Sequence, residues 1–428
     1  MSGRTVLDRC DDLAALSALP DGLIERTYLT REHAAANALV GRWMTEAGMT
    51  SWQDAAGNQC ARLEGDRPGF PALLIGSHLD TVPRAGRYDG ILGVMIALEV
   101  ADRLRGSGVR LPFAVEISAF GDEEGTRFGA TLLGSRALAG TWDPAWWRLT
   151  DADGVSLHEA FIAFGLDPAA VGAAARRPHD LVGYLEAHIE QGPVLEARDR
   201  ALGLVSSIAG ARRMLVTITG RAAHAGTPYP ARRDALAGAS EAVLAVESLA
   251  AAHRLTATVG RLSVVPGAVN VVAGSATFSL DVRAASDQVR DAGLAVVLAE
   301  IERICVRRGL TVDVEHTHEA MTVHCDPAMT TALGQALRAG GDGEPLALFS
   351  AAGHDAMAMA AVTGVGMLFI RCAGGVSHHP EESVLEADVD RAIDAVYAAV
   401  LHLADVYPAE AGRGAPAALS PAGGPEPP

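Results

Sequence analysis

Short apolar segments alternate with helical segments along much of the chain, and this alternation restricts the possible folds more than any other feature. Residues 72–76 and 113–120 have the pattern of buried strands, and residues 91–105 between them have the pattern of a helix. Another buried strand is expected at residues 365–370. Apolar strands that alternate with helices are typical of a sheet covered on both faces. We therefore predict an α/β fold with a mixed, mainly parallel sheet and helices on both sides.

The pattern changes near residue 213, where a different kind of domain is expected to begin. Its elements follow the order strand, helix, strand, strand, helix, strand, which resembles a small α+β sandwich. The α/β pattern resumes at about residue 327. The predicted segments are a strand at 214–218, a helix at 233–252, strands within 256–283, a helix at 286–308 and a strand at 310–315.

These changes predict a main domain that is interrupted by an insertion. The main domain would comprise residues 1–212 and 327–408, and the inserted domain residues 213–326. Residues 409–428 are rich in Pro, Gly and Ala. Such a segment has too little apolar content to fold, so we expect a disordered tail.

The charged residues narrow the range of chemistry. The 428 residues include 35 Lys plus Arg and 52 Asp plus Glu, which gives a net charge of −17, and all the basic residues are arginine. Without lysine, the chain can form no Schiff base, no GK[ST] phosphate loop and no Ser–Lys pair. The acidic balance argues against nucleic acid and anionic membranes as partners. Any fixed positive charge in a site must be a guanidinium or a metal ion.

Cellular location is indicated by the cysteines and the N-terminal segment. The five cysteines are scattered and lack CxxC spacing, which fits reduced thiols better than disulfides or a zinc knuckle. The first residues do not have the pattern of a signal peptide, and the apolar runs are shorter than the roughly 20 residues that span a bilayer. We therefore expect a cytoplasmic protein.

Four clusters of histidine and carboxylate residues lie at predicted strand ends or turns. In an open α/β sheet, ligands bind beyond the carboxyl ends of the strands. Imidazole and carboxylate groups suit Zn²⁺ and similar divalent ions. The clusters are GSHLDTVP with GRYDG at 76–90, GDEEG at 121–125, EAHIEQGP at 186–193 and GVSHHPEE at 375–382.

Each cluster alone is weak evidence. An HxD motif such as His78–Leu79–Asp80 occurs often by chance, and a Glu–Glu pair is usually a solvated helix face. The combination of the four clusters favours a metal site. In such a site one carboxylate can bridge two metal ions about 3.5 Å apart. A neighbouring carboxylate that is not a ligand can take a proton from water. Glu123 and Glu124 fit this division if one is a ligand and the other a free base.

Together these segments resemble the allantoate amidohydrolase and N-carbamoyl-L-amino-acid hydrolase group of dinuclear zinc hydrolases. The wider superfamily includes aminoacylases and carboxypeptidase-like enzymes. The resemblance extends from about residue 8 to residue 405. It implies a zinc-peptidase-like catalytic domain, an inserted lid and dimerisation domain, and two divalent ions, with zinc or manganese favoured over cobalt or nickel. The segments that carry it are GSHLDTVPRAGRYDGILGV, GDEEGTRFG, EAHIEQGPVLE, HAG, RRDAL, PGAVNVV, AGHDAMAMA and GVSHHPEES.

The resemblance also implies roles for residues of the main domain. Glu123 would be the general base, and Asp80 would orient His78, as metal-bound imidazoles usually require. Asp89 would bridge the two ions, and His378 rather than His379 would be a ligand. The metal ligands implied are His78, Asp89, Glu124, His188 and His378.

In the inserted domain, the resemblance implies that His224, Asn270 and Arg283 contact the substrate, and His224 would also take part in catalysis by stabilising an oxyanion. Gln191 resembles a further substrate contact. Alternation along residues 275–283 places Arg283 on the polar face of a strand, where it could clamp a carboxylate or pair with a neighbouring acid. The loop at 225–231 departs from the family pattern, because it is one residue shorter and contains two prolines.

These residues lead to a first hypothesis, a homodimeric two-metal amidohydrolase that cleaves a ureido acid to release ammonia and carbon dioxide. Allantoate is the preferred substrate, and an N-carbamoyl-L-amino-acid hydrolase or a β-ureidopropionase-like enzyme is the alternative. A dipeptidase or aminoacylase of the same superfamily is disfavoured by the HIEQGP segment. A non-catalytic metal-binding relative is disfavoured because the implied base and all five implied ligands are present.

Overall fold

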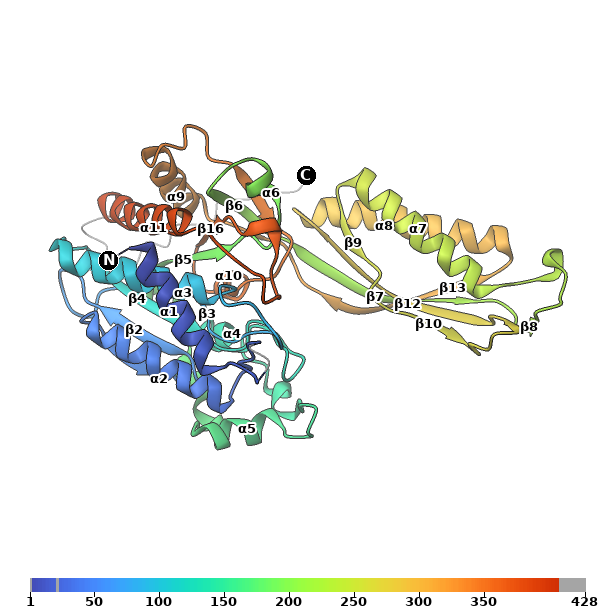
Figure 1. Ribbon diagram of the computed structural model, residues 1–428, viewed down its shortest axis with the longest axis horizontal. Coiled ribbons are helices and arrows are strands. Elements are labelled where there is room, and N and C mark those ends of the chain that lie inside the picture. Colours follow the sequence, from blue (N-terminus) through green and yellow to red (C-terminus); the bar gives the residue numbers. More distant parts are fainter. Residues whose placement is uncertain (1, 21–22, 408–428) are drawn as a thin grey trace, which may run out of the picture. The chain divides into compact units, whose positions relative to one another are not determined.

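The computed structural model describes residues 2–20 and 23–407, so the tail predicted at 409–428 lies outside the described residues. The chain forms two compact units (Figure 1). Among the described residues, unit 1 consists of 2–20, 23–206, 325–348 and 354–407, and unit 2 of Ser207–His324 and Phe349–Gly353. For comparison, the insertion predicted from the sequence spans residues 213–326.

A mixed sheet with the order β1-β2-β4-β3-β5-β16-β6-β14 forms the framework of unit 1, and β15 also pairs with β6. Strand β14 and the last residues of β6 and β15 fall within the bounds of unit 2. The four central strands β4, β3, β5 and β16 run parallel, and the flanking pairs β1–β2, β2–β4 and β16–β6 are antiparallel. The predicted mixed α/β sheet is therefore confirmed. The bounds are β1 Thr50–Gln53, β2 Gln59–Leu63, β3 Ala72–His78, β4 Ala114–Phe120, β5 Leu181–Ile189, β6 Leu202–Ile208, β14 Val323–His324, β15 Ala347–Ser350 and β16 Val365–Ile370.

The main core of unit 1 lies between this sheet and a layer of five helices. Alternate side chains of the central strands enter this core, including Leu73 and Ile75 of β3 and Leu185 and Ala187 of β5. Every residue of β3 and β4 is buried, as expected for strands covered on both faces. The five helices are α1 Gly3–Leu16, α2 Arg31–Glu46, α3 Ile91–Ser107, α9 Pro327–Ala339 and α11 Glu386–Val406.

Shorter elements cover the opposite side of the sheet. Helix α10 packs on β5, β16 and α4, and a smaller apolar cluster contains Tyr28, Leu133 and Phe161. The alternation along β5 directs Glu186 and His188 away from the main core, because Leu185, Ala187 and Ile189 point into it. The remaining short helices are α4 Leu133–Leu138, α5 Leu157–Phe164, α6 Val194–Ala197 and α10 Asp355–Met359.

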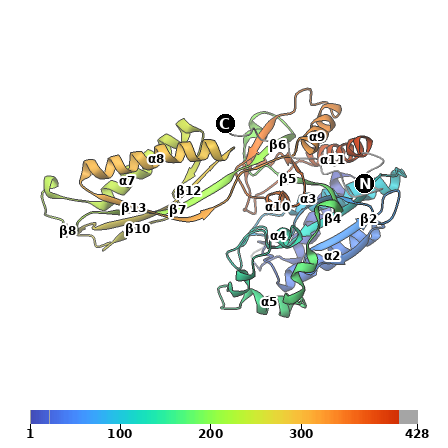
Figure 2. The same ribbon diagram turned by 180° about the vertical axis from the view of Figure 1, so that it is seen from behind.

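Unit 2 has a sheet with the order β10-β12-β7-β13, in which β9 also pairs with β12, and a separate β8–β11 pair. Helices α7 and α8 lie on one face of this sheet (Figure 2). The predicted alternation in β12 is confirmed, because its alternate residues from Ala276 to Ala284 are buried. The bounds are β7 Gly210–Thr219, β8 Ala223–His224, α7 Ala235–His253, β9 Thr256–Thr258, β10 Leu262–Val265, β11 Val271–Val272, β12 Ser275–Ala284, α8 Asp287–Arg308 and β13 Thr311–Glu319.

Helix α7 is long and apolar enough, by length and composition alone, to cross a membrane. Its residues Ala239, Ala242 and Val246 are instead buried in the core of unit 2. Core helices of soluble proteins pass the same test, so a single helix of this kind is weak evidence for a membrane span.

Candidate metal centre

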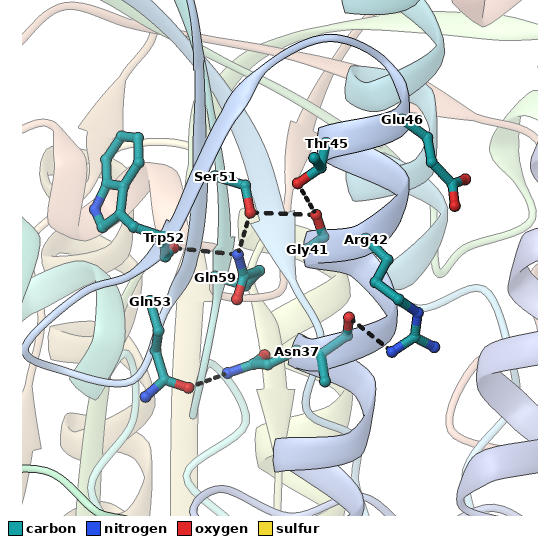
Figure 3. Close-up of a pocket in the computed structure, with 10 residues that line it drawn as sticks. Asn37, Gly41, Arg42, Thr45, Glu46, Ser51, Trp52, Gln53 and Gln59 are labelled. Carbon is teal, nitrogen blue, oxygen red and sulfur yellow. Dashed lines mark hydrogen bonds between the residues drawn. The ribbon is translucent and has the colours of Figure 1, made fainter.

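A pocket of about 470 Å³ lies between α2 and strands β1 and β2 (Figure 3). Asn37, Arg42 and Glu46 of α2 line it, together with Trp52 and Gln59 of the strands. Among the described residues, none of the side chains implicated by the sequence lines this pocket. The candidate site is instead a cluster of buried ionisable groups at the ends of the central strands.

The backbone around Asp89 brings its carboxylate next to the end of β3. His78 is the last residue of β3, and Asp89 lies just before α3, with Gly90 as the N-cap. A Cβ atom at Gly90 would lie 2.3 Å from His78 Nε2, and the φ angle of Gly90 is +74°. Both observations require glycine at this position. The GRYDG segment therefore lets the His78 ring and Asp89 approach each other.

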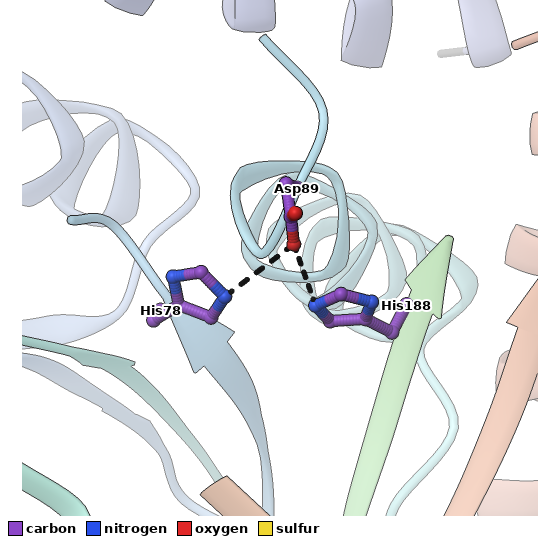
Figure 4. A group of neighbouring side chains, drawn as sticks. All are labelled: His78, Asp89 and His188. Carbon is purple, nitrogen blue, oxygen red and sulfur yellow. Dashed lines mark ion pairs between the residues drawn. The ribbon is translucent and has the colours of Figure 1, made fainter. Parts of the chain in front are cut away.

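His78, Asp89 and His188 form a fully buried group (Figure 4). Asp89 Oδ1 lies 3.8 Å from His78 Nε2 and 3.1 Å from His188 Nε2. The other ring nitrogen of each histidine faces a backbone carbonyl: His78 Nδ1 lies 3.0 Å from the oxygen of Asp80, and His188 Nδ1 lies 2.9 Å from that of Ile189. Because a carbonyl oxygen only accepts, each Nδ1 carries a hydrogen, and each Nε2 faces Asp89.

Asp89, Glu124 and His378 form a second, more exposed group. His378 Nε2 lies 3.0 Å from Asp89 Oδ2 and 3.3 Å from Glu124 Oε1. The hydrogen bonds to these two carboxylates raise the pKa of His378 to about 10. The neighbouring His379 faces Glu381 at 3.9 Å, and its side chain is 56% exposed. His378 is therefore the histidine of this pair that lies at the cluster.

Asp80 connects the His78 end of the cluster to the Glu123–Glu124 pair. Its Oδ1 accepts the backbone N–H of Glu123 at 3.1 Å, and its Oδ2 accepts that of Glu124 at 3.2 Å. Asp80 Oδ1 also lies 3.6 Å from His78 Nδ1. Burial raises the pKa of Glu123 well above its usual range, and the nearby Glu124 and Asp355 add to this effect against the opposing influence of His78. Glu123 is thus a buried carboxyl group that resists ionisation.

The donor atoms fit divalent metal ions. Two groups of ligand atoms, each within 4.8 Å, share Asp89, and Asp89 turns a different oxygen toward each group. Imidazole nitrogens fixed by backbone carbonyls, together with carboxylate oxygens, are the ligands expected for Zn²⁺ or a similar ion. The structure therefore brings together all five ligands implied by the sequence, and the implied base Glu123 lies beside them.

Several buried residues near the cluster were not singled out in the sequence. Glu186 accepts the Ser77 hydroxyl at 2.9 Å and the backbone N–H of Ala356 at 3.0 Å. With His188 and His354 it forms a further group of possible metal ligands. The ring centroids of His188 and His354 are 4.4 Å apart. Glu186 and His354 both occur in segments that carry the family resemblance. Their place in these segments is the only sequence feature that could have indicated them as site residues.

Gln191 lies at the cluster, where its amide Nε2 donates to Asp89 Oδ2 at 2.8 Å. In unit 2, His224 and Asn270 lie together, because β8 pairs with β11 and the N–H of Ala225 donates to the carbonyl of Asn270 at 2.9 Å.

Arg283 lies near the end of β12 and contacts an acidic neighbour. Its Nε and Nη2 donate to Asp281 at 2.8 and 3.1 Å, and its Nη1 donates to the carbonyl of Ala351 at 2.7 Å. The side chain is 25% exposed. Of the two roles that the sequence suggests for Arg283, the ion pair with a neighbouring acid is therefore present in this structure, with Asp281 as the partner.

Comparison with known proteins identifies the family. Residues 74–402 match the family described as peptidase family M20/M25/M40. A probable allantoate deiminase from Oryza sativa subsp. japonica is 41% identical, with 86% of this chain and 82% of the relative covered. An N-carbamoyl-L-amino acid amidohydrolase from Geobacillus stearothermophilus is 38% identical, with 94% of this chain and 99% of the relative covered.

A solved structure agrees with these relatives. The hydantoinase/carbamoylase family amidase from Burkholderia multivorans superposes with a TM-score of 0.86 at 33% identity, and the match covers 94% of this chain and 98% of that one. The extent of these matches and the shared fold lead to one conclusion. The chain belongs to the M20/M25/M40 peptidase family.

Proposed function

We propose that the protein is a metal-dependent amidohydrolase that cleaves the ureido C–N bond of a ureido acid, with allantoate as the preferred substrate, and releases ammonia and carbon dioxide. The observation that carries this proposal is the arrangement of two ligand groups that share Asp89 and lie beside the buried Glu123. Relatives named allantoate deiminase in rice, Arabidopsis thaliana and soybean support the choice of substrate.

The proposed ligands divide into two sets. His78, Asp89 and His188 would hold one divalent ion, and Asp89, Glu124 and His378 the other. Zinc or manganese is favoured, and cobalt or nickel also suits such ligands. When bound, the ions would polarise the ureido carbonyl and make water a better nucleophile near neutral pH.

Glu123 would act as the general base. It would accept a proton from the attacking water and return it to the departing nitrogen. Burial raises the pKa of Glu123 above its usual range, and a higher pKa makes a carboxylate a stronger base. Asp80 would hold this residue in place, because its carboxylate accepts the backbone N–H groups of Glu123 and Glu124.

The substrate carboxylate requires a positively charged partner, and without lysine a fixed positive charge must come from an arginine or a metal ion. We assign this role to Arg283. Its bonds to Asp281 and Ala351 use three of the five guanidinium N–H groups, which leaves one on each terminal nitrogen for a substrate. His224, Asn270 and Gln191 would make further substrate contacts, and His224 would also stabilise the oxyanion.

A homodimer formed through the inserted domain and a cytoplasmic location complete the proposal. The dimer rests on the family resemblance, and the location rests on the scattered cysteines, which fit reduced thiols. The alternative function is hydrolysis of N-carbamoyl-L-amino acids. It is favoured by the bacterial relatives of that name. In one of them, the match to this chain covers 99% of the relative's length.

A substrate panel tests the proposal. Purified protein would be supplied with Mn²⁺ or Zn²⁺ and given allantoate, an N-carbamoyl-L-amino acid, 3-ureidopropionate or a dipeptide, and ammonia release and peptide cleavage would be measured. We expect ammonia release to be fastest from allantoate. Faster release from the N-carbamoyl-L-amino acid would favour the alternative. Dipeptide cleavage without ammonia release from any ureido substrate would overturn both. Light scattering on the eluting protein would test the dimer.

A further inference from the structure

Glu382 makes two contacts with the backbone around the shared ligand Asp89. Its side chain is buried, with the residue 3% exposed. Its Oε1 accepts the N–H of Tyr88 at 2.6 Å and the N–H of Asp89 at 3.1 Å. These bonds join segments that are almost 300 residues apart in the chain. Glu382 therefore holds the Asp89 backbone from a segment that is distant in the sequence.

The same glutamate is connected to the Asp89 side chain through Ser377. The Ser377 hydroxyl lies 2.5 Å from Asp89 Oδ2 and 3.1 Å from Glu382 Oε2. Ser377 directly precedes His378, whose Nε2 lies 3.0 Å from the same Asp89 oxygen. One buried carboxylate thus contacts both the loop that bears Asp89 and the turn that bears His378.

The turn that bears His378 needs such support. His378 has a φ angle of +56°, a conformation that is unfavourable for a residue with a side chain. Its side chain is 45% exposed, so packing fixes it less than it fixes His78 or His188, which are 1% exposed. Strained conformations persist only where surrounding contacts hold them. The bonds of Ser377 and Glu382 provide such contacts.

Gly86 provides the space that Glu382 occupies. A Cβ atom at Gly86 would lie 2.5 Å from the carboxyl carbon of Glu382 and 2.6 Å from its Cβ. These distances are far below van der Waals contact, and the Cβ of Glu382 cannot move without moving its backbone. An alanine at position 86 would therefore displace Glu382 while leaving its carboxylate chemically intact.

We propose that Glu382 is a positioning residue that sets the placement of Asp89 relative to His378 and thereby maintains metal binding by the group Asp89, Glu124 and His378. Glu382 itself belongs to none of the ligand groups formed by the described residues. Because its contacts involve the backbone and a hydroxyl group, its role depends on hydrogen-bond geometry rather than on charge at the metal. The inference rests on the proposed function only in that the cluster binds metal.

Four variants of the full chain test this role. Metal-depleted protein would be titrated with Mn²⁺ in a calorimeter, and its metal content would be measured after dialysis. For Glu382→Ala we expect the Mn²⁺ affinity of one of the two sites, which we assign to Asp89, Glu124 and His378, to fall by about 10- to 100-fold, the range typical of residues that orient metal ligands. Gly86→Ala should cause a similar loss. Glu382→Gln should retain most of the affinity, because the amide oxygen still accepts both N–H groups. The control is Glu381→Ala, which alters an adjacent side chain that is 83% exposed and should bind Mn²⁺ like the wild type.

The outcomes separate this inference from the proposed function. Wild-type protein that binds no divalent ion would remove the proposed function and this inference with it. Wild-type protein that binds Mn²⁺, together with unchanged affinity in both Glu382→Ala and Gly86→Ala, would overturn this inference alone. A loss in Glu382→Gln as large as that in Glu382→Ala would also overturn it, because charge would then matter more than placement. Circular dichroism would verify folding, and if Glu382→Ala does not fold, the comparison of Gly86→Ala with Glu382→Gln decides.

Discussion

The carboxylate of Asp80 accepts the backbone N–H of Glu123 at 3.1 Å, and its second oxygen accepts the next N–H along the chain at 3.2 Å. The backbone carbonyl of Asp80 faces His78 Nδ1 at 3.0 Å. A single residue after β3 therefore orients a proposed metal ligand and also fixes the segment that carries the proposed base.

Replacing the Asp80 side chain tests the second of these roles, because every variant keeps the backbone carbonyl that faces His78. Asp80→Ala removes both oxygens that accept the N–H groups of Glu123 and Glu124, and we expect the affinity for metal to fall by about 10- to 100-fold. Asp80→Asn keeps one acceptor oxygen and should give an intermediate loss of metal affinity. Metal content after dialysis and kcat on the best ureido substrate would be measured together. Wild-type values for both in Asp80→Ala would contradict the assignment.

The two adjacent glutamates should respond differently to the same change. Glu123→Gln should keep its metal and lose about 10²- to 10⁴-fold in kcat, because a general base is removed. Glu124→Gln should lose metal, because Glu124 Oε1 lies 3.3 Å from His378 Nε2 in the second ligand group. Metal analysis and steady-state kinetics check both variants. The reverse pattern would mean that the two roles are exchanged.

Local patterns in the sequence predicted several of the elements that carry candidate site residues. The apolar runs that became β3 and β4 and the alternation in β12 all depend on residues close in sequence. The contacts that hold the cluster together depend on residues far apart. Periodicity cannot indicate that Glu382 reaches Asp89, or that β16 lies between β5 and β6. Those features follow from long-range pairing, which has no local signature.

Substitution of Arg283 tests the proposed carboxylate contact. Arg283→Lys keeps the charge but loses the planar, two-pronged donor, so we expect KM to rise by at least about tenfold, a cost near 1.4 kcal/mol. Arg303→Lys is the control, because Arg303 pairs with Glu300 on the surface of α8. Initial rates over a range of substrate concentrations would give kcat and KM separately. An unchanged KM in Arg283→Lys would exclude Arg283 as the anchor.

The buried His33 should make stability depend on pH. Burial lowers the pKa of His33 to about 4, and its Nδ1 accepts the N–H of Leu29 at 3.1 Å. The unfolded chain binds this proton near pH 6.5, so the contribution is complete above that pH and is lost as the pH falls toward 4. Between pH 7 and pH 5 this amounts to about 2 kcal/mol.

Urea unfolding at the two pH values measures this dependence. His33→Gln should lose about 2 kcal/mol of the difference in unfolding free energy between pH 7 and pH 5. His158→Gln alters an exposed histidine and should keep the wild-type difference. An equal pH dependence in wild type and His33→Gln would show that His33 is not the group responsible.

Arg26 is a fully buried cation that holds the segment after β3. Its guanidinium donates to the carbonyls of Leu79 at 2.6 Å and Leu13 at 3.0 Å, and to the Ser17 hydroxyl at 2.7 Å. Arg26→Met leaves these buried acceptors unpaired, and we expect it to lower the free energy of unfolding by about 2–5 kcal/mol. Arg87→Met breaks an exposed pair with Asp11 and should cost less than about 1 kcal/mol. Urea unfolding measures both variants. An equal loss of unfolding free energy in Arg26→Met and Arg87→Met would contradict the stabilising role of Arg26.

The position of β16 between β5 and β6 has a consequence for biosynthesis. β5 carries His188, yet the strand that completes its pairing is made some 180 residues later, after the whole of Ser207–His324. At about 5–20 residues per second, a ribosome needs roughly 10–40 s to cover that distance. His378 follows β16 within ten residues. Completion of the sheet and arrival of the last proposed ligand therefore coincide, and a nascent chain has neither until residues 365–378 have been made.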